Sequence, residues 1–261
     1  MNGPRTIGGL FESLVDRGAE RPVLTFYDDA TAERTELSGA TLRNWVAKTA
    51  NMLVDDLDLR PGQWAAVGLP PHWQTAAVLL ACWTVGLAVT MSPDPAEVAF
   101  VAARAPSDQP GAPVEWPAAD EWPAVERYVL GLHPMGLPLA TVPPGYLDYP
   151  TEIRVHGDAF STRDPVGPDT PALRWTEDAV THEGTQAMLC GRAAERATTM
   201  GIPYAARVLV DADALPDPVD WLLAPLSAAA TVVLCVNTDV ARLDARVAAE
   251  RVDAVIRERR A

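Results

Sequence analysis

Asp211 and Asp213 are the residues whose type and spacing best suit chemistry in this chain. They are separated by one residue and directly follow the apolar run 207–210. Carboxylates at the end of a strand can hold a divalent ion that bridges sugar-nucleotide phosphates, so a metal-dependent nucleotide-sugar enzyme is one interpretation. The motif is short and common by chance, and we favour a surface turn instead. In that case Asp217 or Asp220 begins the next helix, where a carboxylate suits the helix dipole.

The histidines and cysteines, the other residue types that could ligate a metal, are dispersed along the chain. No histidine pair has HxxxH or HExxH spacing, and no cysteine pair has CxxC spacing. We therefore expect no metal ligands and no disulfide framework, and interpret the cysteines as buried free thiols. The sequence also lacks G-x-S-x-G, GxGxxG and GxxxxGK motifs, so we assign no catalytic or cofactor-binding residue and expect no cofactor. The residues concerned are His72, His133, His156, His182, Cys82, Cys190 and Cys235.

The balance of charge excludes some partners. The chain has 35 acidic and 21 basic side chains, a net charge of −14. Because this field repels phosphate, we expect neither nucleic acid nor a membrane as partner. The only lysine is Lys48, which lies in a helical pattern between Val46 and Met52. We interpret it as part of a solvated helix face, not as a nucleophile or a phosphate-binding group.

The sequence shows no sign of export or membrane insertion. No apolar run reaches the ~20 residues that span a bilayer. Residues 1–5 lead straight into a polar-punctuated helix, so we expect no signal peptide and a cytoplasmic location.

The elements that must position these residues alternate between short strands and helices, which predicts an α/β domain with a largely parallel sheet. Breakers are concentrated in 104–170, which we interpret as an irregular proline-rich insertion. Trp116 and Trp122 lie in this insertion; we expect them to cover the core, with a contact surface as the alternative. The predicted helices are 6–17, 38–53, 72–85, 176–200, 219–228 and 239–250. The predicted strands are 23–27, 35–37, 64–69, 87–91, 128–132, 171–175, 207–210, 231–236 and 252–256, and 153–160 is a further short element.

Two blocks of the chain carry a family resemblance. The turn Leu57-Asp58-Leu59-Arg60-Pro61-Gly62 precedes Val67-Gly68-Leu69-Pro70, and the run Asp220 to Leu234 reads as a helix followed by an apolar strand. These motifs resemble the first half of the N-terminal domain of adenylate-forming (AMP-binding, acyl-CoA synthetase-like) enzymes. The chain also looks like short actinobacterial proteins that share the pattern. The resemblance implies the fold, because the matching motifs belong to the scaffold.

The motifs that carry the family's activity are missing from this sequence. The resemblance implies a glycine-rich phosphate loop near 161–175, where backbone N–H groups and a lysine contact ATP. Here 161–171 has one glycine, three prolines and no lysine. The family's adenine-side tyrosine-glycine-x-threonine-glutamate motif and its small C-terminal domain with the catalytic lysine are absent too. None of the family's functional residues therefore transfers to this sequence.

We expect residues 1–261 to form one α/β domain, with a mixed, largely parallel sheet flanked by helices, like a truncated N-terminal domain of an adenylate-forming enzyme. The leading functional hypothesis is a non-catalytic relic, a pseudoenzyme that acts as a binding or interaction module, with a homodimer or a protein partner. The alternatives are a degenerate ligase subunit that needs a partner chain, and the metal-dependent enzyme using Asp211 and Asp213.

Overall fold

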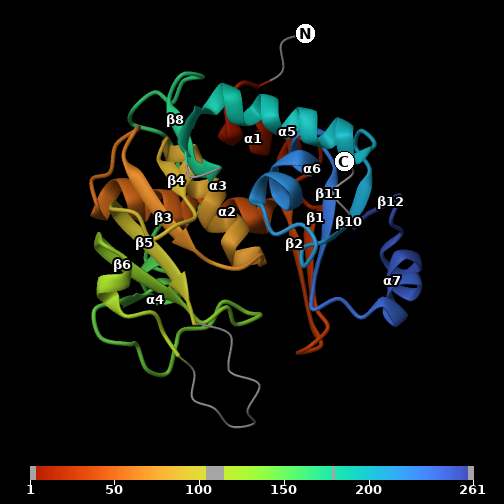
Figure 1. The fold of residues 1–261 in the computed structure, drawn as a ribbon, viewed down its shortest axis with the longest axis horizontal. Helices are drawn as coiled ribbons and strands as arrows, with labels where there is room; N and C mark the ends of the chain where they lie inside the picture. The colour runs from red at the N-terminus through yellow and green to blue at the C-terminus, as the bar shows by residue number, and fades with distance from the viewer. Residues whose placement is uncertain (1–3, 104–114, 178–179, 258–261) are drawn as a thin grey trace.

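The computed structural model describes residues 4–103, 115–177 and 180–257 and contains two mixed sheets, which Figure 1 shows beside each other. The first has five strands in the order β12-β10-β11-β1-β2, and the second has seven in the order β7-β6-β5-β3-β4-β8-β9. All pairs are parallel except β1–β2 and β8–β9. The mixed, largely parallel α/β fold is thus confirmed, divided between two sheets.

The strands of the five-stranded sheet are β1 (Pro22–Asp28), β2 (Glu33–Ser38), β10 (Arg207–Asp211), β11 (Thr231–Val236) and β12 (Ala254–Ile256). Those of the seven-stranded sheet are β3 (Trp64–Gly68), β4 (Ala88–Thr90), β5 (Ala96–Ala102), β6 (Ala124–Leu130), β7 (Leu147–Asp148), β8 (Pro171–Glu177) and β9 (Val180–Thr185). The helices are α1 (Ile7–Val15), α2 (Gly39–Asn51), α3 (Trp73–Val85), α4 (Tyr149–Ile153), α5 (Gln186–Met200), α6 (Ala224–Ser227) and α7 (Leu243–Glu250). Short turns of helix are η1 (Met52–Asp56), η2 (Ala119–Glu121), η3 (Val219–Leu223) and η4 (Val240–Arg242).

Helix α3 lies at the centre of the molecule, as its sequence predicts. It is apolar on all sides, and every residue from Trp73 to Val85 except Thr84 is buried. A helix without a polar face must be covered on all sides, and α3 contacts α1, α2, β1 and β4. His72 caps its start by accepting the Gln74 backbone N–H, and Gly86 ends it with a φ of 85°.

Helix α2 has two different faces. Leu42, Val46 and Ala50 are buried and face the core. Its polar residues Lys48 and Asn51 recur on another side of the same helix. Ser38 caps the helix by accepting the Thr41 backbone N–H. The helix therefore joins the core on one side and presents a polar stripe on another.

The expected long helix 176–200 is wrong at its start. Residues 171–177 and 180–185 pair as the antiparallel strands β8 and β9, and α5 begins only at Gln186. The cap is Thr185, whose hydroxyl accepts the Met188 backbone N–H. The prediction was wrong because the residue types in 176–185 are compatible with a helix. The pairing of β8 with β4, which extends the sheet, outweighs this local preference.

The segment 104–170 contributes more structure than its prolines suggest. Its described part holds η2, β6, β7 and α4, and the element expected at 153–160 is α4 at 149–153 followed by irregular chain. Trp116 and Trp122 are partly buried against Val101 and Val129, so the expectation that they cover the core is confirmed. The prolines at positions 106, 110 and 113 lie outside the described residues. That 1–261 is one domain stays a prediction.

Candidate ligand-binding site

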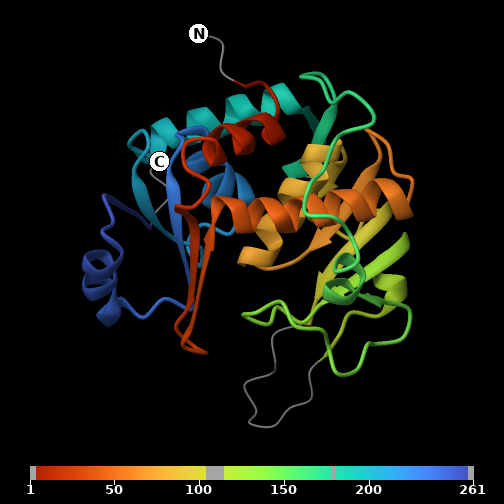
Figure 2. The same cartoon turned by 180° about the vertical axis from the view of Figure 1, so that it is seen from behind.

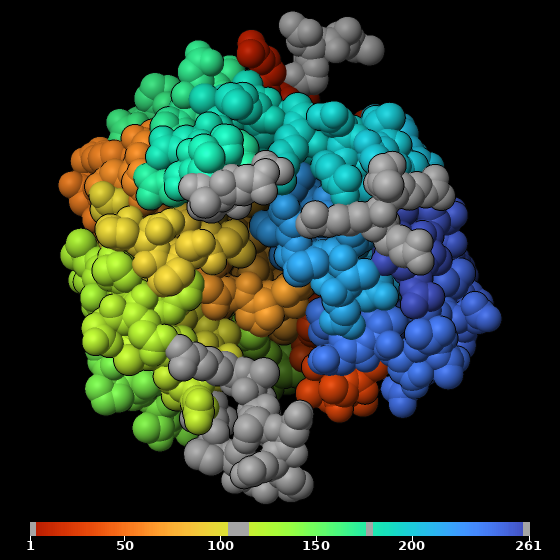
Figure 3. All heavy atoms as spheres, viewed as in Figure 1, coloured from red at the N-terminus to blue at the C-terminus, as the bar shows by residue number. Residues whose placement is uncertain are grey.

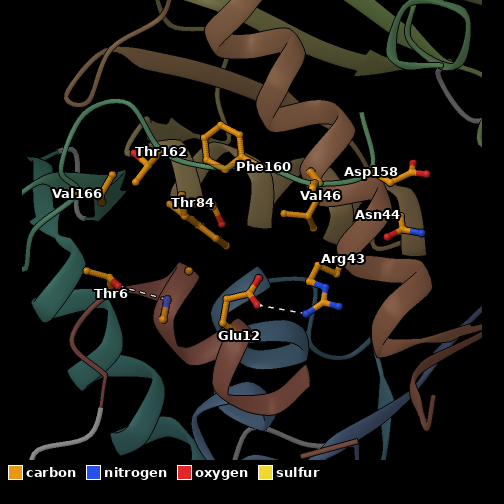
Figure 4. Close-up of a pocket in the computed structure, with 15 residues that line it drawn as sticks. Thr6, Glu12, Arg43, Asn44, Val46, Thr84, Asp158, Phe160, Thr162 and Val166 are labelled. Carbon is orange, nitrogen blue, oxygen red and sulfur yellow. Dashed lines mark hydrogen bonds and ion pairs between the residues drawn. The ribbon is translucent and has the colours of Figure 1, made fainter. Parts of the chain in front are cut away.

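A cavity of about 530 Å³ lies between α1, α2, the end of α3 and residues 158–166 (Figure 4). Its apolar wall includes Val46, Trp83 and Phe160. Glu12 from α1 and Arg43 from α2 point toward one another across its polar side. The cavity thus combines an apolar body with a charged end, which is typical of small-molecule sites.

The polar groups of the cavity are only partly satisfied. Arg43 Nη1 lies 3.8 Å from Glu12 Oε2, and both side chains are about half exposed, so this ion pair is weak. The hydroxyl oxygen of Thr84 is buried and has no hydrogen-bond partner among the described residues. Buried polar groups normally have a partner, so the Thr84 hydroxyl is an unsatisfied polar group in a residue that lines the cavity.

The start of α1 is held in place by Gln186. Its side-chain oxygen accepts the Ile7 backbone N–H at 2.9 Å, and its amide donates to the Trp83 carbonyl at 3.1 Å. Thr6 caps the helix by accepting the Gly9 N–H. One buried glutamine therefore fixes α1 against α3 and α5 and sets one wall of the cavity.

Residues 154–170, which we call the strap, form the opposite wall and cross over α2 (Figure 2). Lys48 Nζ donates to the His156 carbonyl at 2.6 Å and lies 2.7 Å from an Asp158 carboxylate oxygen. The Asn51 amide donates to the carbonyls of Gly157 and Ala159, both at 3.0 Å. The polar stripe of α2 is thus a binding surface for backbone carbonyls of the strap.

Ion pairs extend this attachment. Arg163 pairs with Asp55, and Arg60 pairs with Asp164 at 3.0 Å. At the end of the strap, Val166 packs against Gly86, where an added Cβ would lie 3.0 Å from the Val166 Cγ2 atom. The strap therefore has an apolar anchor near one end and polar attachments along its length.

The interpretation of Lys48 as a solvated residue is wrong, because its side chain is only 25% exposed and binds the strap. The signal was present in the sequence: Lys48, Asn51 and Asp55 recur at helical spacing and share one face of α2 and η1. Helical spacing shows which residues share a face, but it does not show what covers that face.

The structure places Asp211 and Asp213 at the end of β10, as expected. Asp211 accepts from the Thr238 hydroxyl at 3.1 Å and lies 3.5 Å from Arg257 Nε, and Asp213 accepts the Thr238 N–H at 2.9 Å. Both carboxylates therefore take part in contacts with other residues of the protein. In the described parts of the chain no three histidine, cysteine, aspartate or glutamate side chains are grouped to hold a metal. Asp217 accepts the Val219 N–H at the start of η3.

The histidines and cysteines are in separate environments. His72 lies 3.7 Å from Glu33, His156 lies 3.0 Å from Asp56, and His182 stacks on Trp175. His133 accepts the Met135 N–H. The three cysteines are free, and burial raises the pKa of Cys82 to about 12 and that of Cys190 and Cys235 to about 11. These thiols are protonated at neutral pH and poor nucleophiles.

No helix in the described ranges combines the length and apolar character needed to cross a bilayer. Figure 3 shows the face of the molecule seen in Figure 1, with the cyan spheres of the α5 region across its top.

Comparison with solved structures confirms the expected resemblance at the level of fold. The N-terminal domain of FACL13 from Mycobacterium tuberculosis is 14% identical, with a TM-score of 0.68 over 96% of this chain and 62% of that one. A fatty acyl CoA synthetase from the same organism is 14% identical, with a TM-score of 0.64 over 96% and 49%. Acetoacetyl-CoA synthetase from Streptomyces lividans is 18% identical, with a TM-score of 0.69 over 88% and 38%. The chain thus spans less than two thirds of these solved structures.

A comparison with protein-family models gave no match. Among curated proteins, the TIGR03089 family protein of Mycobacterium tuberculosis is 38% identical over 267 residues, which is 98% of this chain and all of the relative. An identity of this size over the full length of both sequences shows common descent and a shared fold. The chain belongs to the TIGR03089 family, and its fold matches part of the N-terminal domain of adenylate-forming enzymes.

Proposed function

We propose that the protein binds a small organic ligand in the cavity under the strap and does not form acyl-adenylates itself. The observation that carries the proposal is the cavity of about 530 Å³, which falls within the range of small-molecule sites, ~300–1,000 Å³. It is a non-catalytic binding role on an adenylate-forming fold.

The lining of the cavity suggests the kind of ligand. Val46, Trp83 and Phe160 favour an apolar body. The unpaired Thr84 hydroxyl and the weakly paired Arg43 favour a polar group on the same molecule that accepts hydrogen bonds. The proposed ligand is therefore a small amphipathic molecule with a hydrogen-bond acceptor.

The absence of adenylating activity is supported by the region expected to contact ATP. Residues 161–170 belong to the strap, where Arg163 and Asp164 form ion pairs with Asp55 and Arg60. Three prolines in 161–171 remove backbone donors that a phosphate would need.

The test is thermal unfolding with a panel of acyl-CoAs, small amphipathic acids and amides, ATP, AMP and UDP-sugars, each with and without Mg²⁺. A ligand at 100 times its Kd adds about 2.7 kcal/mol to the stability. Asn44 is exposed and lines the cavity, so Asn44→Trp should block binding. Glu195→Trp, at an exposed site on α5 away from the cavity, should not.

The other hypotheses give different results in the same panel. A degenerate ligase subunit should show stabilisation by Mg²⁺-ATP that Asn44→Trp leaves unchanged. A metal-dependent site at Asp211 and Asp213 should show stabilisation by Mg²⁺ and UDP-sugars that Asp213→Asn removes. A flat panel, with concentration-dependent association in solution, would replace the proposal with a protein-interaction module or a homodimer.

A further inference from the structure

We infer that the strap is the gate of the cavity, and that Lys48 is one of the main contacts that hold it closed. This inference rests on the proposed function, because a gate has a purpose only if the cavity takes up a ligand. It identifies the route of entry and a residue that controls it.

The middle of the strap lies between two cavities, which is where a gate would control entry. Asp158 and Asn44 line the 530 Å³ cavity and also a second cavity of about 250 Å³, which Lys48 and Arg154 help to line. The middle of the strap therefore has a cavity on each side of Asp158, and Phe160 is its apolar side chain packed against the core. A segment with limited buried apolar contact opens at lower free energy than the core does.

The attachments of the strap are the kind that can break and re-form. The carbonyls of His156, Gly157 and Ala159 are bound by the side chains of Lys48 and Asn51. Outward movement of the strap therefore breaks these contacts without disturbing a sheet or a helix. Each such contact in a partly exposed position costs little to break, because water replaces the lost partner.

Lys48 is the central contact because it makes two bonds at the point between the cavities. It binds the His156 carbonyl and the Asp158 carboxylate together. Val166 against Gly86 and the buried Ile153 anchor the two sides, so both ends stay in place when the middle moves. The geometry is that of a flap anchored on both sides, whose middle is held by Lys48 together with Asn51.

The test uses Lys48→Met, which keeps the aliphatic stem and removes the charge. The matched control is Arg174→Met: Arg174 is 24% exposed and pairs with Glu183 at 2.8 Å, against 25% and 2.7 Å for Lys48, and it lines neither cavity. The probe is 1-anilinonaphthalene-8-sulfonate, an amphipathic monoanion, and stopped-flow fluorescence gives its association rate. Lys48→Met should raise that rate about fivefold or more, and Arg174→Met should leave it unchanged.

A second measurement works in the unmodified protein. Because Lys48 is the only lysine, acetic anhydride labels one side chain besides the terminal amine, and mass spectrometry of peptides separates the two. Saturating probe should slow acetylation of Lys48 several-fold, since a filled cavity keeps the strap closed. This measurement remains available if Lys48→Met does not fold.

The outcomes separate the gate from the proposed function. If Asn44→Trp abolishes probe binding but Lys48→Met and Arg174→Met bind at the same rate, the cavity is a site and the gate is wrong. If Asn44→Trp has no effect, the proposed function fails. The gate is then decided by hydrogen exchange of 156–164, which must be faster in Lys48→Met than in Arg174→Met; equal exchange overturns it.

Discussion

His72 shows how one buried side chain ties stability to pH. Its Nδ1 accepts the Gln74 N–H, so the neutral ring carries its proton on Nε2, 3.7 Å from Glu33. Burial lowers the pKa of His72, while Glu33 and Asp28 oppose this effect. A hydrogen bond to Nδ1 and a buried position both favour the neutral ring.

We predict that His72 makes the protein less stable as the pH falls below about 6.5, the unperturbed histidine pKa. The unfolded chain takes up a proton there that the folded chain excludes, so stability falls by up to about 1.4 kcal/mol per pH unit. His72→Asn keeps a capping oxygen and removes the titration. Urea unfolding at pH 7.5 and 5.5 should show a smaller difference for the variant, and an equal difference would contradict this role.

Glu250 is the centre of a buried charge network that attaches α7 to the five-stranded sheet. It accepts from Tyr27 at 2.6 Å, Arg34 at 2.9 Å and Arg207 at 2.5 Å, and its side chain is 7% exposed. Burial opposes ionisation, but the hydrogen bonds from Tyr27, Arg207 and Arg34 outweigh it and lower the pKa of Glu250. The carboxylate is therefore the stable form in the fold.

We predict that Glu250→Gln lowers the free energy of unfolding at pH 7 by about 2–3 kcal/mol, because two arginines lose their buried counter-charge. The lowered pKa means that the contribution of Glu250 is present above the unfolded pKa of about 4.3 and lost as the pH falls through the folded pKa. The variant should therefore lose less stability than the wild type on acidification below pH 4.5. Calorimetry at pH 7 and pH 3.5 measures the stability of the wild type and of the variant. An identical loss of stability on acidification would contradict this role of Glu250.

At the scale of elements, α3 depends on its end as much as on its apolar sequence. Gly86 has a φ of 85°, and an added Cβ would lie 2.9 Å from Pro61 Cβ and 3.0 Å from Val166 Cγ2. We predict that Gly86→Ala costs about 2 kcal/mol or more, from the left-handed backbone and the overlap with its neighbours. Gly191 lies in α5 with nothing within 4 Å of its added Cβ, so Gly191→Ala should instead stabilise by about 0.5–1 kcal/mol. A loss of stability in both variants would show that α5 does not tolerate the methyl group added at position 191.

Elements with one strong local pattern were predictable. Helix α3 follows from an apolar run between a capping residue and a glycine, and β10 and β11 follow from short runs rich in valine and leucine. Strand β5 (Ala96–Ala102) was missed, since alanine and glutamate disfavour strands and only its place between β3 and β6 makes it one. The start of α5 was misplaced because pairing of β8 with β4 is a long-range contact.

The candidate site was not predictable, because it is made by segments far apart in the chain. Lys48 meets Asp158 across about a hundred residues, and Gln186 reaches Ile7 across 179. The polar stripe of α2 and the proline-rich strap can each be recognised in the sequence, but the contact between them cannot. Which loop would cover which helix face depends on the topology of both sheets.

At the scale of the whole molecule, one hydrophobic cluster includes residues from both sheets, such as Phe26 and Val232 from one and Val67 and Phe100 from the other. Helix α3 contributes the buried centre of this cluster and contacts a strand of each sheet. Two sheets that share one core and one central helix gain their stability together.

We predict that the two sheets unfold in a single transition, as expected for one domain. Leu79 is fully buried in α3, and Leu79→Ala should cost about 3 kcal/mol by leaving a cavity. Since α3 serves both sheets, hydrogen exchange should speed up to the same extent in β10–β11 and in β3–β5. If hydrogen exchange speeds up in only one sheet, the two sheets are separately folding units. The strap crosses from α4 to β8 over α2, so its exchange would then follow the stability of the seven-stranded sheet alone.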